Sequence, residues 1–75
     1  MFIARMEGEE RVWYALGNTE AEAMDAILDK WNQYQTSLVQ TGWKNYPDHY
    51  SNAKKLDEDY GIMVLQLEPG ECCFW

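Results

Sequence analysis

The chain has 75 residues, of which 47% are hydrophobic and 15% aromatic, and it carries a net charge of −7. This much apolar side chain predicts a folded protein, and the length predicts one domain, residues 1–75. The acidic charge disfavours direct binding to nucleic acid and to anionic membranes, because both are negatively charged, and it favours a basic protein partner.

The first predicted element is a β-hairpin in FIARMEGEERVWYALG, where apolar residues alternate on both sides of a polar tip. A two-residue loop of Gly8 and Glu9 would pair Glu7 with Glu10, which places like charges opposite each other. A three-residue loop from Gly8 to Glu10 pairs Glu7 with Arg11, and we prefer it. This register predicts a core face of Phe2, Ala4, Met6, Val12, Tyr14 and Leu16, and an opposite face of Ile3, Arg5, Trp13 and Ala15.

A helix is predicted over about residues 20–37, because Thr19 followed three residues later by Glu22 forms a capping box. One face of this helix is polar and is predicted to be exposed to solvent; it contains Asp29, Lys30, Asn32 and Gln33. The apolar stripe predicted to lie across the hairpin consists of Ala23, Met24, Ile27, Leu28, Trp31, Gln35 and Leu38.

Between Val39 and Tyr60 the regular pattern ends, apart from one possible helical turn at SNAKKLDED. A final strand is predicted in YGIMVLQLE, with Met63, Leu65 and Leu67 on one side and Ile62 and Val64 on the other. The sequence therefore predicts an α+β fold in ββαβ order. A small antiparallel sheet, made of the N-terminal hairpin and the C-terminal strand, packs on one amphipathic helix.

One helix covers only one face of such a sheet, so the other face needs a cover, either the aromatic loop or another chain. We expect a homodimer that uses this face and the end of the chain, ECCFW, which follows a predicted type II turn at Pro69-Gly70. The residues predicted to self-associate are Ile3, Trp13, Ile62, Val64, Cys73 and Trp75.

The sequence contains no catalytic, cofactor-binding or phosphate-binding motif, and we expect a protein that is not an enzyme and uses no cofactor. Cys72, Cys73, His49 and Asp48 are ligand types for zinc, but adjacent cysteines on a strand point to opposite faces, so we expect no metal site. Paired carboxylates lie at turn tips or on wet helix faces, whereas acid–base catalysis needs a sheltered carboxylate.

Acidic and aromatic side chains form the predicted partner-binding surface. Carboxylates can pair with arginines that normally hold phosphates. The loop aromatics could instead stack on a nucleotide or cover the sheet. The predicted partner-binding residues are Glu7, Glu9, Glu10, Trp43, Tyr46, Tyr50, Asp57, Glu58 and Asp59.

The segment NTEAEAMDAILDKW resembles the helix start of HicB-like antitoxins, where a Thr cap precedes a run of Glu and Ala. This resemblance implies a small sheet-plus-helix domain with a small basic toxin as partner, although those antitoxins usually have three strands before the helix. In size, acidity and aromatic content the chain also looks like the bacteriophage proteins that block host defences, including anti-CRISPR proteins. That likeness implies a stoichiometric inhibitor of a host defence or nucleic-acid-processing protein, often dimeric.

A second hypothesis is an oligomeric sponge that sequesters a nucleotide signal, with a pocket built from loop aromatics and Arg5, Arg11, Lys54 or Lys55. For location, the start MFIARMEG lacks the features of a signal peptide, and the longest apolar run, IMVL, is too short to span a bilayer. We therefore expect a cytoplasmic protein, in the host cytosol if a phage encodes it.

Overall fold

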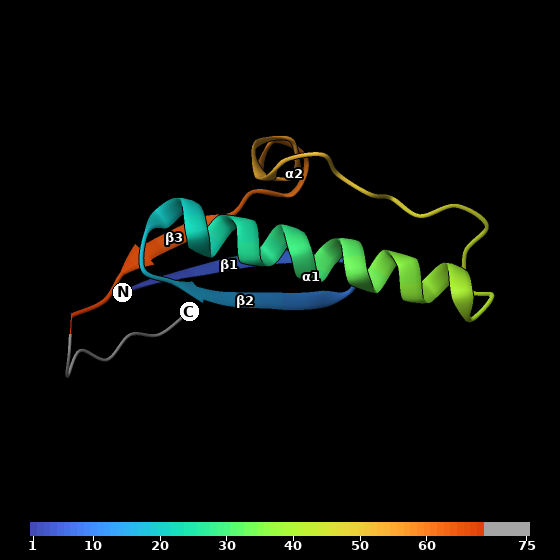
Figure 1. Cartoon of the computed structure of the whole chain (residues 1–75), viewed down its shortest axis with the longest axis horizontal. Helices are drawn as coiled ribbons and strands as arrows, with labels where there is room; N and C mark the ends of the chain where they lie inside the picture. Colours follow the sequence, from blue (N-terminus) through green and yellow to red (C-terminus); the bar gives the residue numbers. More distant parts are fainter. Residues whose placement is uncertain (69–75) are drawn as a thin grey trace.

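The structure, a computed structural model, describes residues 1–68 and confirms the α+β fold in ββαβ order. Strand β1 lies between β2 and β3 in one antiparallel sheet, α1 crosses one face of that sheet, and α2 packs beside α1 (Figure 1). The turn predicted at Pro69-Gly70 and the terminal strand, with Cys73 and Trp75, fall outside the described residues. The elements are β1 (Phe2–Gly8), β2 (Arg11–Gly17), α1 (Glu20–Gln40), α2 (Ala53–Tyr60) and β3 (Met63–Gln66).

Helix α1 begins at the predicted capping box. The Glu22 backbone N–H donates to Thr19 Oγ1 at 3.1 Å, and the Thr19 N–H donates to Glu22 Oε2 at 3.1 Å. Because these side chains satisfy N–H groups that have no partner inside the helix, they fix its first turn. The helix extends to Gln40, beyond the predicted end at residue 37. Its buried stripe agrees with the prediction and contains Ala23, Ile27, Trp31 and Gln35.

The register of the hairpin differs from the prediction. The loop has two residues, Glu9 and Glu10, and Gly8 pairs with Arg11, so Met6 lies opposite Trp13. A shift of one residue turns every side chain of a strand to the other face. The predicted core positions of Val12, Tyr14 and Leu16 are therefore wrong: all three are exposed, and Trp13 and Ala15 pack on the core instead.

Ring packing at Gly8 explains this register. A Cβ atom at Gly8 would lie 3.0 Å from Tyr60 Cδ1 and 3.2 Å from Trp31 Cζ3, so the two rings need a residue without a side chain there. The Trp13 indole N–H also donates to the Gly8 carbonyl at 3.1 Å. Gly8 is therefore needed in the strand, where the two rings pack over it, and Glu9 and Glu10 are left to form the turn.

Strand β3 also presents its faces the opposite way round. Ile62 and Val64 pack against the core, so these two residues and Trp13, all predicted to self-associate, lie on the covered face. Ile3 remains on the uncovered side, where it pairs with Leu16 and Leu65. We call this side the outer face; it consists of Ile3, Arg5, Glu7, Val12, Tyr14, Leu16, Met63 and Leu65.

The core centres on Trp31, whose side chain is fully buried. Its ring lies 4.8 Å from the Tyr60 ring, 5.5 Å from the Trp13 ring and 6.3 Å from the Tyr50 ring, measured between centroids. Its indole N–H donates to the Asp48 carbonyl at 2.8 Å. Aromatic residues of the sheet, the loop and α2 therefore converge on one side chain of α1.

The loop between the helices is fixed on α1 by a residue that was predicted to be solvated. Asn32 Nδ2 donates to the Tyr50 carbonyl at 3.0 Å, and the Tyr50 N–H donates to Asn32 Oδ1 at 3.0 Å. The helical turn expected in SNAKKLDED is confirmed as α2, whose Leu56 is buried in the same core cluster as Ala4 and Met6. Both helices therefore pack on one face of the sheet, and the exposed residues of the outer face remain uncovered within residues 1–68.

Candidate partner-binding site

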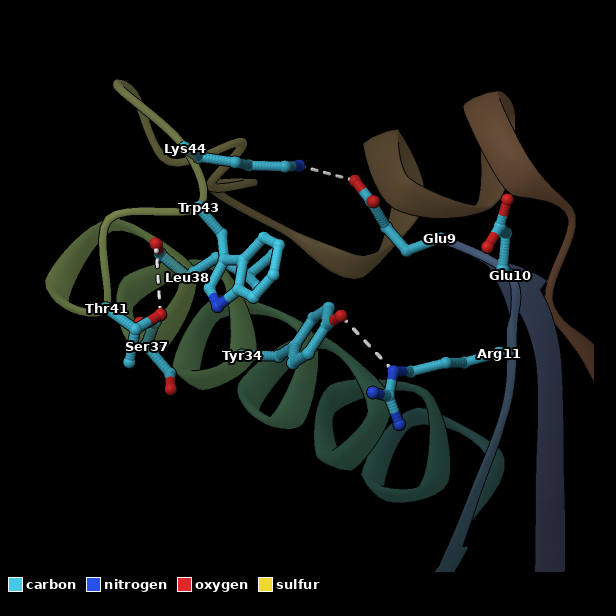
Figure 2. Close-up of a pocket in the computed structure, with 9 residues that line it drawn as sticks. All are labelled: Glu9, Glu10, Arg11, Tyr34, Ser37, Leu38, Thr41, Trp43 and Lys44. Atoms are coloured by element: carbon cyan, nitrogen blue, oxygen red, sulfur yellow. Dashed lines mark hydrogen bonds and ion pairs between the residues drawn. The ribbon is translucent and has the colours of Figure 1, made fainter.

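A hollow of about 660 Å³ lies between the tip of the hairpin and the last turns of α1 (Figure 2). The hairpin forms one wall, α1 forms the floor, and the first residues of the loop after α1 form the other wall. It brings together segments that are about 30 residues apart in the sequence. Its lining consists of Glu9, Glu10, Arg11, Tyr34, Ser37, Leu38, Thr41, Trp43 and Lys44.

The tip of the hairpin is a strained turn. Glu9 has a φ of 54° and Glu10 a φ of 60°, which is the left-handed conformation that a type I′ turn requires at both central residues. Asn and Gly usually occupy such positions, because a larger side chain there costs about 1 kcal/mol or more. The protein therefore holds two carboxylates at a conformational cost, and strain of this kind is concentrated at functional sites.

One of the two carboxylates is engaged in an internal clamp. The Lys44 ammonium donates to Glu9 Oε1, to Gln35 Oε1 at 2.8 Å and to Asp48 Oδ2 at 3.2 Å. Gln35 is fully buried, and its Nε2 lies 3.4 Å from the same Glu9 oxygen. The hydrogen bond to Glu9 raises the pKa of Lys44, against an opposing effect of burial. The clamp ties the hairpin tip to α1 and to the loop, and so fixes both walls of the hollow.

The floor of the hollow is also held in place. Arg11 Nε donates to the Tyr34 hydroxyl at 3.2 Å, and its guanidinium carbon lies 5.1 Å from the centre of the Tyr34 ring. The Tyr34 ring in turn meets the Trp13 ring edge-on, with centroids 5.2 Å apart. Arg11 therefore holds the Tyr34 hydroxyl (Figure 2) and makes a cation–π contact with its ring, while Trp13 connects that ring to the core.

Two groups of the hollow have no such internal role. Glu10 is exposed, and within residues 1–68 it makes no hydrogen bond or ion pair. The Trp43 side chain is 82% exposed. A free carboxylate and an exposed indole on two walls of one hollow are suited to a planar cation, because the carboxylate accepts hydrogen bonds and the ring face attracts positive charge.

Three of the predicted partner-binding residues thus meet in one place: Glu9, Glu10 and Trp43 line the hollow. Tyr46 is 82% exposed on the loop but does not line it. Sequence reasoning missed Tyr34, which follows the buried Trp31 by three positions and so lies next to it on the same side of α1, where both rings contact Trp13. Helical spacing could have identified it, because Tyr34 lies within the predicted helix, residues 20–37.

Tyr50 and Asp59 have a structural role instead. The Tyr50 hydroxyl donates to Asp59 Oδ2 at 2.6 Å, and this bond, together with burial, raises the pKa of Tyr50. The pKa of Tyr60 is raised too, chiefly by burial and then by the charges of Glu9 and Asp48. Glu9 at the hairpin tip and Asp48 in the loop therefore both raise the pKa of Tyr60.

The remaining predicted acids are dispersed. Glu7 pairs with Arg5 on the outer face at 2.6 Å, and Asp57 Oδ1 accepts from the Ile62 N–H at 2.6 Å near the end of α2. Glu58 is exposed on α2. The cations expected for a nucleotide sponge are also separated: Arg5 lies on β1, Arg11 lines the hollow, and Lys54 and Lys55 lie on α2.

No grouping of three or more His, Cys, Asp or Glu side chains that could hold a metal ion occurs among the described residues. His49 Nε2 lies 2.8 Å from Thr36 Oγ1 on the exposed side of α1, and Cys72 and Cys73 lie outside the described part of the chain. Neither α1 nor α2, the two helices within residues 1–68, has the length and apolar composition needed to cross a membrane. No family model, curated protein or solved structure matches this chain.

Alkaline pH is expected to destabilise the fold. The pKa values of Tyr50, Tyr60 and Lys44 are all raised in the folded state, so above about pH 10 the folded chain binds more protons than the unfolded chain. The stability these groups contribute is complete below pH 10 and is lost as the pH rises further. Urea midpoints measured between about pH 9 and 11.5 should fall, and Tyr50→Phe should reduce the loss. Constant midpoints over this range would contradict the role given to these groups.

Proposed function

We propose that this protein is a non-enzymatic binding protein that docks an arginine of a basic partner between Glu10 and Trp43. The supporting observation is that Glu10, strained and unpaired within residues 1–68, and Trp43, 82% exposed, line the same hollow. A guanidinium can stack on an indole while it donates to a carboxylate, and this geometry is available to arginine more than to lysine. The net charge of −7 speeds the encounter with a basic protein.

The biological setting that best fits this chemistry is inhibition. Arginines that contact nucleic acid are exposed and unpaired until the nucleic acid binds, so a protein carboxylate can occupy them in its place. The proposed partner is a host defence protein or another nucleic-acid-processing protein, which a phage-type inhibitor would bind in the host cytosol in a one-to-one ratio. A small basic toxin could also place an arginine against Glu10 and Trp43. A toxin gene beside the gene for this protein would favour this antitoxin-like alternative.

The test is a titration of a short, dye-labelled arginine-rich peptide with the full chain, followed by the fluorescence anisotropy of the dye, which is also readable in a variant without Trp43. We expect binding that weakens with added salt, and a matched lysine peptide should bind less tightly. Glu10→Gln and Trp43→Ala should each weaken binding by about tenfold. Asp29→Asn removes an exposed carboxylate of α1 outside the hollow and should leave binding unchanged. Equal loss in Asp29→Asn and Glu10→Gln would mean that only net charge matters, and would refute the site.

A nucleotide ligand is the second candidate, since Arg11, Tyr34 and Trp43 line the hollow together and could hold a phosphate and a base. Glu9 and Glu10 oppose it, because they repel phosphate. Cyclic and linear nucleotides at about millimolar concentration should then raise the melting temperature of the protein, as any ligand of the folded state does. Stabilisation by nucleotide without any response to the arginine peptide would replace the first proposal with this one.

A further inference from the structure

The outer face of the sheet is apolar and open. Leu16 is 57% exposed, Tyr14 52%, Met63 51% and Val12 47%, although each is large and belongs to a strand. They lie in register: Leu16 and Leu65 flank Ile3, and Tyr14 and Met63 flank Arg5. A contiguous apolar patch of this kind on a small protein is typical of an interaction surface.

The charges of this face distinguish it from the rest of the molecule. Arg5 and Glu7 are its two charged residues, and they cancel, so the whole excess of seven negative charges belongs to other parts of the chain. A basic protein would be drawn to those acidic parts. Two copies of this chain repel each other in most orientations, and the repulsion is weakest where the two neutral faces meet.

The two charges also suit a twofold axis. Arg5 and Glu7 are neighbours on the same side of β1, with Arg5 Nη2 2.6 Å from Glu7 Oε1. In a twofold arrangement, a contact of residue i with residue j of the other copy is matched by a contact of j with i. An axis that lies in the interface and crosses β1 at Arg5 sets the row of Ile3 and Leu16 opposite the row of Glu7 and Val12 of the second copy, and leaves each Arg5 one row from the Glu7 of that copy.

We infer that the outer face is the interface of a homodimer, in which a second copy of this chain covers Ile3, Tyr14, Leu16, Met63 and Leu65. Strand spacing and rise give this face about 14 by 23 Å, or roughly 300 Å² of flat area per copy. Stable interfaces bury about 600–1,000 Å² of accessible surface per partner, so the outer face supports a weak dimer that dissociates on dilution. The dimer leaves the hollow free, because the hollow lies at the hairpin tip and on α1, and the interface does not depend on the proposed function.

Sedimentation of the full chain from about 10 µM to about 1 mM tests this inference. The apparent mass should rise towards twice the chain mass of 8.8 kDa. Leu16→Lys should abolish the rise, because a buried unpaired charge is costly at an interface. Gln33→Lys, which adds the same charge on the exposed side of α1, should keep it. A Leu16→Lys variant that dimerises like the original chain would overturn the inference.

A mixing experiment tests the pairing of Arg5 with Glu7. Arg5→Glu leaves two acids on the face and Glu7→Arg leaves two bases, so each variant alone should stay monomeric and an equal mixture should form heterodimers. Circular dichroism of each variant checks that it is folded. A wild-type chain that is monomeric at every concentration would overturn the inference. If the wild-type chain were monomeric and Leu16→Lys lowered the free energy of unfolding, the result would favour residues 69–75 of the same chain as the cover of the outer face.

Discussion

Replacing Trp31 with alanine is expected to unfold the protein at room temperature. Trp31 is fully buried, contacts the rings of Trp13, Tyr50 and Tyr60, and donates a hydrogen bond to the Asp48 carbonyl. Truncation of a buried tryptophan to alanine costs about 3–5 kcal/mol. A single core in a chain of this length supplies no more than about 3–5 kcal/mol in total. The loss therefore matches the whole stability of the fold.

The matched control is Trp43→Ala, which removes the same kind of side chain from a position that is 82% exposed. Its free energy of unfolding should stay within about 0.5 kcal/mol of wild type. Trp31→Phe keeps a ring in the core but loses the bond to Asp48, so we expect an intermediate loss of about 1–2 kcal/mol. Circular dichroism and urea denaturation measure all three variants. Cooperative unfolding of Trp31→Ala near the wild-type midpoint would show that the core does not depend on this residue.

The second large effect is expected at Glu10, where one substitution should change stability and binding in opposite directions. Glu10 occupies the second central position of a type I′ turn with a φ of 60°, where glycine is preferred. Glu10→Gly relieves the strain and should raise the free energy of unfolding by about 1 kcal/mol, even after the added flexibility of the unfolded chain. The same substitution removes the unpaired carboxylate and should weaken arginine-peptide binding about tenfold.

Glu10→Gln separates the two effects, because it keeps the strained backbone and the shape of the side chain but removes the charge. It should weaken binding as much as Glu10→Gly does and leave the urea midpoint close to wild type. Proteins commonly lose stability where function requires an unfavourable residue, and this pair of variants measures that cost directly. A Glu10→Gly variant that binds the peptide like wild type would remove Glu10 from the site. If that variant were instead less stable than wild type, strain would not explain the turn.

Local signals in the sequence determined the elements. The Thr19 and Glu22 capping box, the apolar spacing of α1 and the alternation in the strands predicted the fold class, the start of α1 and its buried stripe. These features act over three or four residues, so they can be read without knowing what the chain packs against. The acidic and aromatic composition likewise identified Glu9, Glu10 and Trp43, which line the hollow.

Tertiary contacts decided the register of the hairpin and, with it, the site and the outer face. Turn preferences place a glycine in the loop, but Gly8 is required beneath the Tyr60 and Trp31 rings, and these residues lie 52 and 23 positions further along the chain. The turn is therefore formed by Glu9 and Glu10, one residue away from the loop that the sequence predicts. As a result, Trp13 rather than Leu16 faces the core, and Leu16 is exposed. Because strand side chains alternate with a period of two, the contacts of two distant rings with one glycine were enough to exchange the two faces of that strand.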